Sequence, residues 1–269
     1  MQFHKRFMVK GGGPADLSDF DPDECAGLGD KEHAQELLDK YHRKLADLQE
    51  LLYAEGKRAL LIVLQAMDAG GKDGTIRHVM SSVNPQSCRV TSFKAPTPEE
   101  LAHDFLWRIH RAVPRRGEIG IFNRSHYEDV LIVRVHKLVP RDVWSKRYDQ
   151  INKFEASLAD NGVHILKFFL HISRDEQLKR LRERLEDPRK HWKISPEDFK
   201  ERRYWDKYIK AYGEAIGRCS TPRAPWFVIP ANRKWFRNLA ISRIVIETLE
   251  SLDMKYPKPS FDVSKIVVK

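Results

Sequence analysis

Apolar residues change their spacing several times along the chain, and each spacing is typical of one kind of element. Between residues 37 and 52, leucines and one tyrosine recur every three or four positions, which predicts an amphipathic helix with Asp30 as its N-cap. Residues 58–66 are mostly apolar without alternation, as in a strand buried on both faces of a parallel sheet. Further strands are predicted at residues 88–93, 118–123, 163–172 and 226–231.

Helical segments separate these strands. A helix follows the glycine turn after the first strand, and a capping box with proline at the first helical position starts another at Thr97. Apolar spacing predicts a helix from about residue 143 to Asn161-Gly162 and a last one over residues 234–252. Strands that alternate with helices of this length form βαβ units, so the predicted fold class is α/β with a five-stranded parallel sheet.

The pattern also divides the chain into segments. Residues 1–29 are irregular and are predicted to form an arm on the surface or on a neighbouring subunit, and residues 253–269 form a tail. Between them, residues 30–252 form one domain. A helical hairpin is inserted at about 174–212; it has capping signals at Ser173 and Ser195, and a proline breaks it at residue 188.

The composition of the chain limits the kinds of partner and site that we expect. Lysine and arginine total 48 against 38 acidic residues, and this excess favours polyanionic partners. Three scattered cysteines support neither a disulfide framework nor a zinc site. The N-terminus has no apolar stretch of the signal-peptide kind, and no apolar run reaches membrane-spanning length, which predicts a cytoplasmic protein with no membrane partner.

The turn after the first strand carries the clearest chemical signal. The run Ala66-Met-Asp-Ala-Gly-Gly-Lys-Asp-Gly-Thr75 resembles the P-loop pattern, with Ala66 at the first glycine position and Asp73 in place of the usual Ser or Thr. Backbone N–H groups at such a strand–turn–helix junction converge on one point, and Lys72 adds a positive charge there. The turn is therefore predicted to bind phosphate.

Asp68 is an acid within this turn, next to the predicted phosphate site. A carboxylate repels bound phosphate unless a cation lies between them, so Asp68 is either a Mg²⁺ ligand or a base near the phosphate acceptor. A third interpretation is that Asp68 only caps the turn, with its carboxylate accepting hydrogen bonds from backbone N–H groups.

A second chemical segment follows the strand at residues 118–123. Asn123, Arg124, Glu128 and Asp129 come at the carboxyl end of that strand, where open parallel sheets bind their ligands. Arg124 offers a fork for phosphate oxygens, and Asp129 is placed to hold Mg²⁺. His126 as a phosphorylated nucleophile is disfavoured, because direct phosphoryl transfer needs no covalent step.

The basic hairpin at 174–212 has the composition of a lid that closes over a phosphate site and excludes water. The alternative is a solvated hairpin held by local Glu–Arg pairs. Its tryptophans, Trp192 and Trp205, are expected to form hairpin core.

Taken together, the segments Met67–Gly74, Phe122–Asp129 and Arg182–Lys193 resemble the polyphosphate kinase 2 family over nearly the whole chain. The resemblance implies a three-layer α/β/α P-loop kinase fold of the thymidylate-kinase type. It implies phosphoryl transfer between inorganic polyphosphate and a nucleotide with Mg²⁺ or Mn²⁺. Many members have Asp where this chain has Asn123, and here Glu128-Asp129 follow. This pattern is similar to the branch that phosphorylates both AMP and ADP and so makes ATP.

The resemblance also assigns roles to residues. It implies catalytic roles for Asp68, Lys72, Arg124 and Asp129, with Asp68 and Asp129 holding the metal and Glu128 as an alternative ligand. The implied phosphate- and nucleotide-binding residues are Ala69, Gly70, Gly71, Asp73, Gly74, Thr75, Asn123 and Glu128. The implied polyphosphate-binding residues of the lid are Arg182, Arg184, Lys190 and Lys193.

Two other functions share some of these features. A nucleoside monophosphate kinase that uses ATP shares the fold, the turn and the lid, but the altered P-loop and the long basic lid argue against it. A nucleic-acid-binding domain with Trp192, Trp205, Arg203 and Lys207 on its surface lacks any recognised nucleic-acid-binding signature, so no nucleic acid partner is expected. The first helix and the arm predict a homo-oligomer, a dimer or a tetramer.

Overall fold

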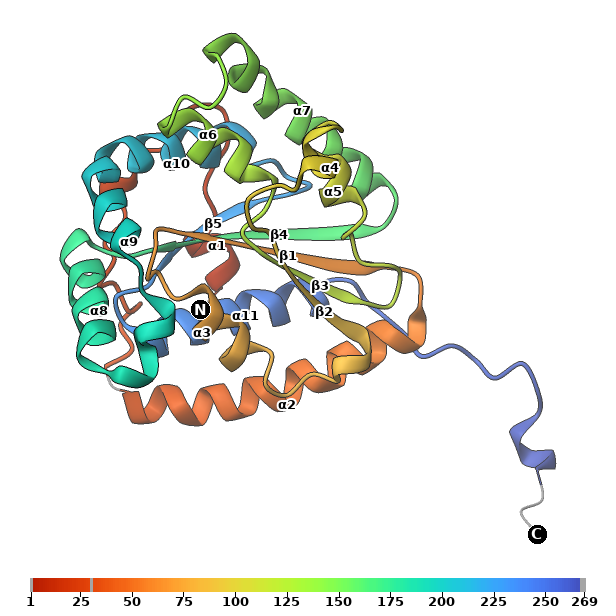
Figure 1. Cartoon of the computed structure of the whole chain (residues 1–269). Helices are drawn as coiled ribbons and strands as arrows, with labels where there is room; N and C mark the ends of the chain where they lie inside the picture. Colours follow the sequence, from red (N-terminus) through yellow and green to blue (C-terminus); the bar gives the residue numbers. More distant parts are fainter. Residues whose placement is uncertain (1, 30, 267–269) are drawn as a thin grey trace.

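Five parallel strands form one sheet in the order β2-β3-β1-β4-β5 (Figure 1). The computed structural model describes residues 2–29 and 31–266, so the predicted N-cap Asp30 lies outside the described residues. The strands are β1 (Ala59–Ala66), β2 (Cys88–Ser92), β3 (Ile119–Asn123), β4 (Val163–His171) and β5 (Trp226–Pro230). The predicted five-stranded parallel sheet is confirmed.

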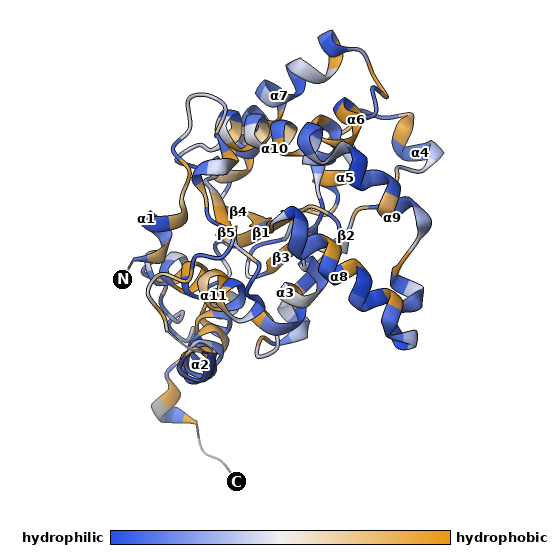
Figure 2. Ribbon diagram, turned by 90° about the vertical axis from the view of Figure 1, so that its left-hand side faces the viewer, coloured by the Kyte–Doolittle hydropathy of each residue, from blue (hydrophilic) through white to orange (hydrophobic). Residues whose placement is uncertain are grey.

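Helices cover both faces of the sheet (Figures 1 and 2). One layer contains α2 (Lys31–Glu55), α3 (Lys72–Val79) and α11 (Lys234–Glu250). The other contains α6 (Ile132–Val135), α7 (Arg141–Asp160) and α10 (Trp205–Cys219), while α4 (Pro98–Leu101) and α5 (Trp107–His110) lie beside it. The three-layer α/β/α arrangement is the predicted one.

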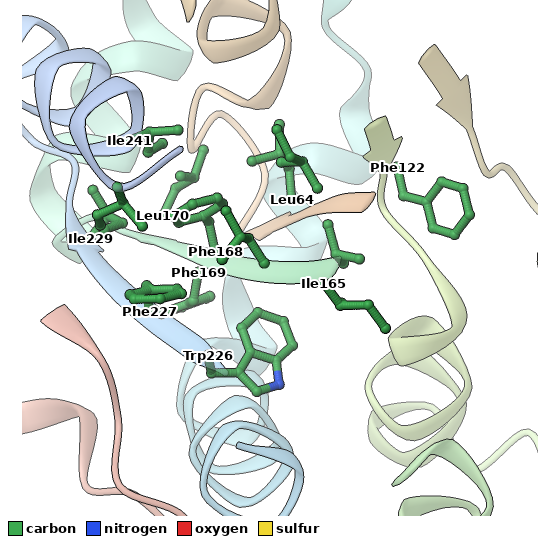
Figure 3. Close-up of a cluster of buried hydrophobic side chains, with 14 of the residues drawn as sticks. Leu64, Phe122, Ile165, Phe168, Phe169, Leu170, Trp226, Phe227, Ile229 and Ile241 are labelled. Atoms are coloured by element: carbon green, nitrogen blue, oxygen red, sulfur yellow. The ribbon is translucent and has the colours of Figure 1, made fainter. Parts of the chain in front are cut away.

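The core lies around the central strands. Every residue of β1 is buried, which is the reason for its unbroken apolar run. Aromatic side chains of β4 and β5 fill the space between the sheet and the helices; the rings of Phe168 and Phe227, for example, lie 5.3 Å apart (Figure 3). This packing fixes the strand ends, from which the functional loops leave.

The N-terminal arm packs on its own domain. Its short helix α1 (Phe3–Phe7) buries Phe3 and Phe7 against Phe236 of α11, at ring distances of 6.1 and 5.9 Å. Val9 N–H donates to the carbonyl of Trp226 in β5 at 2.8 Å. Of the two predicted positions for the arm, the surface of its own chain is the one the structure shows.

The apolar face of α2 is also used within the chain, because it packs along α11. The two features from which an oligomer was predicted therefore have intramolecular partners. Apolar spacing indicates that a helix face needs a partner, but it does not indicate whether that partner belongs to the same chain.

The predicted lid lies beyond the carboxyl ends of the strands (Figure 1). It consists of α8 (Arg174–Glu186), a 3-10 helix η4 (Pro188–Lys193), α9 (Pro196–Glu201) and a second 3-10 turn η5 (Arg202–Tyr204). The second helix of the hairpin is thus interrupted, and α10 continues past residue 212 into the core. In the described part of the chain, no helix combines the length and apolar character needed to span a bilayer.

Candidate active site

The turn between β1 and α3 is shaped by steric demands that only particular residues meet. A Cβ at Gly70 would lie 2.5 Å from Ala66 Cβ and 2.8 Å from the Met67 carbonyl oxygen. Gly71 has φ of 100° and Ala69 has φ of 59°, both in the left-handed region. This backbone starts α3 abruptly, so the free N–H groups of its first turn are available to an anion.

Lys72 lies at the centre of a charged cluster. Its Nζ donates to the carbonyl of Ala66 at 3.2 Å. Burial, and then the neighbouring charge of Arg124, lower the pKa of Lys72, while Asp68 and Glu128 oppose that shift. Lys72, the lysine of the glycine turn, therefore lies among charged groups of both signs.

The two chemical segments meet because β3 lies beside β1, with Asn123 in register with Leu64. Arg124 takes a left-handed conformation with φ of 64°, and its Nη2 lies 3.2 Å from Asp68 Oδ1. Asn123 Nδ2 donates to Asp73 Oδ1 at 2.9 Å. A non-glycine residue with positive φ carries backbone strain, and here the strain turns the Arg124 side chain towards the glycine turn.

Glu128 and Asp129 point in different directions. Glu128 lines a cavity beside the turn together with Asp68 and Arg124. Burial raises the pKa of Glu128, and Arg124 and Lys72 oppose that shift. Asp129 Oδ1 instead accepts from Arg147 Nη1 at 2.9 Å and lies in neither cavity beside the turn. The expectation that Asp129 shares a metal with Asp68 does not fit this placement. The two residues sit in a 3-10 turn, η3 (His126–Val130), whose successive side chains diverge by about a third of a circle.

Thr75 also departs from the expected role. Its hydroxyl donates to the carbonyl of Gly71 at 3.1 Å, and the residue is only 1% exposed. The hydroxyl therefore caps a carbonyl in the first turn of α3, and Thr75 does not line the cavity formed by residues 68–74 of the turn.

Two cavities flank the Asp68–Arg124 ion pair. The turn chamber, of about 430 Å³, is lined by residues 68–74 together with Ser92, Phe93, Lys94, Asn123, Arg124, Arg184, Lys193 and Asp198. The tyrosine chamber, of about 330 Å³, is lined by Ala66, Met67, Asp68, Arg124, Glu128, Ile132, Gln177, Glu197, Asp198, Glu201, Tyr208 and Tyr212. Both chambers share Asp68, Arg124 and Asp198, so a group bound in one can meet a group bound in the other at the ion pair.

The lid contributes two of its four predicted basic residues to the turn chamber. Lys193 Nζ lies 3.8 Å from Asp73 Oδ2, and Arg184 Nη1 donates to the carbonyl of Lys193 at 3.1 Å. Arg182 is exposed, and Lys190 pairs with Asp187 at 3.1 Å; neither lines the chamber. Arg184 and Lys193 are therefore the lid cations positioned over the turn.

Several polar residues that the sequence did not single out support the turn from behind. Arg180 Nη1 donates to the carbonyls of Ala69 and Gly70 at 3.1 and 3.2 Å. Gln177 Nε2 donates to the Asp68 carbonyl at 2.9 Å, and the Tyr212 hydroxyl donates to that of Ala66 at 3.1 Å. In the sequence, the only indication of these contacts was that polar residues recur on one face of a helix of the predicted hairpin.

A second buried arginine lies under the turn. A Cβ added to Gly71 would come within 2.1 Å of Arg237 Nη1, so the glycine leaves room for this guanidinium. Burial, and then the nearby charge of Arg180, lower the pKa of Arg237 to about 9. Two cations therefore add positive potential beneath the N-terminus of α3, where an anion is expected.

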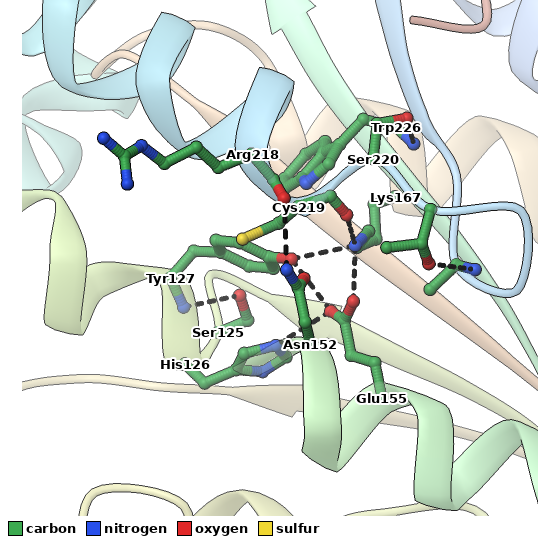
Figure 4. A network of polar contacts seen from close by, with 12 residues as sticks. Ser125, His126, Tyr127, Asn152, Glu155, Lys167, Arg218, Cys219, Ser220 and Trp226 are labelled. Atoms are coloured by element: carbon green, nitrogen blue, oxygen red, sulfur yellow. Dashed lines mark hydrogen bonds and ion pairs between the residues drawn. The ribbon is translucent and has the colours of Figure 1, made fainter. Parts of the chain in front are cut away.

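A buried network holds the η3 turn that carries Glu128 (Figure 4). The Glu155 carboxylate lies 3.1 Å from His126 Nε2 and accepts from the Tyr127 hydroxyl at 2.9 Å. Lys167 Nζ lies 2.5 Å from Glu155 Oε2 and also donates to the Tyr127 hydroxyl and the Cys219 carbonyl. His126 thus faces this network and lines neither chamber, as expected for a residue without a nucleophilic role.

Comparison with protein-family models gives a match over residues 28–257 to the model described as polyphosphate kinase 2. The chain is 56% identical to the AMP/ADP-polyphosphate phosphotransferase of Meiothermus ruber over 98% of this chain and 100% of that protein. It is 47% identical to the ADP-polyphosphate phosphotransferase of Rhodopseudomonas palustris over 94% of this chain and 92% of that protein.

Solved structures give the same result. The crystal structure of polyphosphate kinase 2 from Arthrobacter aurescens TC1 matches with a TM-score of 0.95 at 45% identity, covering 98% of this chain and 94% of that one. A putative polyphosphate kinase 2 from Pseudomonas aeruginosa matches with a TM-score of 0.83 at 32% identity, covering 93% of this chain and 51% of that one.

Proposed function

The chain belongs to the polyphosphate kinase 2 family, and on this premise we propose that it transfers the terminal phosphoryl group of inorganic polyphosphate to AMP and to ADP. The name of the Meiothermus ruber relative includes both acceptors, which supports the dual specificity. The observation that carries the proposal is the pair of chambers that meet at Asp68 and Arg124.

The two chambers differ in charge, which assigns the substrates. The turn chamber has more cations than acids and suits a chain of phosphates: its cations are Lys72, Lys94, Arg124, Arg184 and Lys193, and its acids are Asp68, Asp73 and Asp198. The tyrosine chamber carries Tyr208, Tyr212 and Ile132 next to Glu128 and Glu201, and suits a nucleoside whose ribose and base need hydrogen-bond acceptors and apolar contact. The nucleotide phosphate then meets the end of the polyphosphate at Arg124.

Catalysis by this site rests on alignment and charge neutralisation, the main factors in phosphoryl transfer. The N–H groups of α3 and Lys72 hold the donor phosphates, and Arg124 holds oxygens of the transferred group. Asn123 Nδ2 donates to the Asp73 carboxylate, and Lys193 lies near it, so these two groups offset the negative charge of Asp73 at the edge of the chamber. Arg184 and Lys193 close the chamber from the lid and exclude water.

Mg²⁺, with Mn²⁺ as an alternative, is the proposed cofactor. The donor set fits it: the carboxylates of Asp68 and Glu128 line the tyrosine chamber together with Arg124. Few protein ligands suffice, because Mg²⁺ usually takes one or two carboxylates and completes its shell with phosphate oxygens and water. When bound, the ion neutralises the charge of the phosphates and orients their oxygens.

The first experiment compares phosphoryl donors. Purified protein is mixed with AMP, Mg²⁺ and polyphosphate without ATP, the nucleotides are resolved over time, and the assay is repeated with ADP. We expect AMP to yield ADP and then ATP. ATP from ADP alone would reject AMP as an acceptor. Turnover of AMP with ATP but not with polyphosphate would instead establish the nucleoside monophosphate kinase, which the relatives do not favour.

We also propose a cytoplasmic homo-oligomer, a dimer or a tetramer, whose contacts would lie outside the arm and the α2 face that pack within the chain. The molecular mass in solution decides this point: the mass of a single chain, 31.5 kDa, would reject the oligomer.

A further inference from the structure

A third cavity opens beside the turn chamber and is larger than it. This arginine groove, of about 590 Å³, is lined by Arg89, Lys94, Arg108 and Arg111 and by the acids Glu99 and Glu100, among others. Ser92, Phe93 and Lys94 line both the groove and the turn chamber. The two cavities therefore form one continuous surface that leads away from the glycine turn over the end of β2.

The arginines of the groove are held in place. Arg89 Nη2 donates to the Ala112 carbonyl at 2.7 Å, and Arg108 Nη1 donates to the Lys94 carbonyl at 2.9 Å. Each guanidinium has five N–H donors, so these anchors leave others for a ligand. Glu100 lies 3.5 Å from Arg108, so these two charges offset each other. Arg89, Lys94 and Arg111 then outnumber the remaining acid, Glu99, and the groove has a net positive charge.

The groove is poorly suited to a nucleobase. Two aromatic side chains line it. Phe93 is buried and has the Arg108 guanidinium over its ring at 5.5 Å. Trp107 already has His103 stacked on it at 4.1 Å and the Arg111 guanidinium over its ring at 4.6 Å. What remains for a ligand is a series of cations. Such a surface matches a linear chain of phosphates and not a flat, uncharged ring.

We propose that the arginine groove binds the distal part of the polyphosphate chain while its reacting end lies in the turn chamber. This inference rests on the proposed function, since it assigns a place to that donor. The groove gives long chains contacts that short chains cannot reach, so KM for polyphosphate falls as the chain lengthens.

The test is the chain-length dependence of KM in the double variant Arg89→Gln/Arg111→Gln. Arg223→Gln is the control, because Arg223 pairs with Asp160 at an exposed site outside all three cavities. KM is measured for long polyphosphate and for the shortest chain that the wild-type protein turns over, with the Tm of each variant as a check of folding. Arg89→Gln and Arg111→Gln are also tested singly, for the case in which the double variant is unstable.

For the double variant we expect KM for long chains to rise about ten-fold, and its dependence on log salt to become shallower by about one per lost cation. KM for the shortest chain and for ADP stays at the wild-type value. Equal rises for long and short chains would overturn the proposal, and a rise for ADP alone would assign the groove to the nucleotide. If the wild-type protein uses no polyphosphate at all, that result rejects the proposed function, and the groove proposal falls with it.

Discussion

Replacing Lys167 by methionine should destabilise the protein strongly, because it leaves Glu155 buried without its cation. The side chains of Lys167 and Glu155 are 0% and 2% exposed, and the pair joins β4 to α7 beneath the η3 turn. Breaking a buried ion pair from one side costs about 3–5 kcal/mol. For a chain of this size each kcal/mol lowers Tm by about 2–4 °C, so the expected loss is roughly 6–20 °C.

The same variant should show a changed pH dependence of stability. Burial alone raises the pKa of Glu155, but Lys167 and His126 outweigh it and hold that pKa below its ordinary value. In the wild-type protein the carboxylate therefore stabilises the fold at pH values above the pKa that Glu155 has in the unfolded chain. This contribution is lost as pH falls through the pKa of Glu155 in the folded protein. Without Lys167 the folded pKa rises above the unfolded one, so the variant gains stability as pH falls. The difference in Tm should be smaller at pH 5 than at pH 8.

The assay is thermal unfolding followed by circular dichroism, with Lys44→Met as the matched control. Lys44 pairs with Glu250 at 3.3 Å, but the two side chains are 49% and 43% exposed, so we expect a change under about 1 kcal/mol. Adding Glu155→Gln to Lys167→Met should recover part of the loss, since no charge then stays buried. If Lys167→Met melted as close to wild type as Lys44→Met does, the reasoning about the buried pair would be refuted.

Three further predictions concern the site. Lys72→Ala should lower kcat/KM for polyphosphate by at least about 100-fold with an unchanged circular dichroism spectrum, because it removes a charge from the phosphate site; near-normal turnover would contradict the assignment. Glu128→Gln should reduce kcat more than Asp129→Asn does, because only Glu128 faces the turn, and steady-state kinetics showing the reverse order would restore Asp129 as the site acid. Gly70→Ala should lower stability by at least about 1 kcal/mol, because its Cβ would clash with Ala66 and Met67, whereas Gly13→Ala has open space and should change Tm little; equal Tm values would contradict the steric argument.

The order of strands and helices was predictable because each element carries its own local signal. The unbroken apolar run of β1 and the alternation of helices with strands predicted the parallel sheet, and the sheet has that form. The glycine turn was equally readable, since left-handed backbone and close contact at residues 70 and 71 allow few other residues. Neighbouring parallel strands then bring Arg124 to Asp68, as expected for loops at one edge of a sheet.

What the sequence could not decide was the direction of side chains in irregular turns and the partners of polar groups far apart in the chain. Glu128 and Asp129 are adjacent acids, and the sequence interpretation favoured Asp129 as the metal ligand. The 3-10 geometry of η3 instead turns Glu128 to the cavity beside the turn and Asp129 to Arg147. Arg180 and Arg237 come from α8 and α11, and their burial beneath the glycine turn depends on how these helices pack.

The amino-acid sequence by itself thus determined where the strands and most helices form and where the glycine turn lies, because steric and periodic signals act over a few residues. The tertiary structure decided which acid faces the turn, which cations support it and where the N-terminal arm lies. These outcomes depend on burial and charge among segments that meet only in the folded chain.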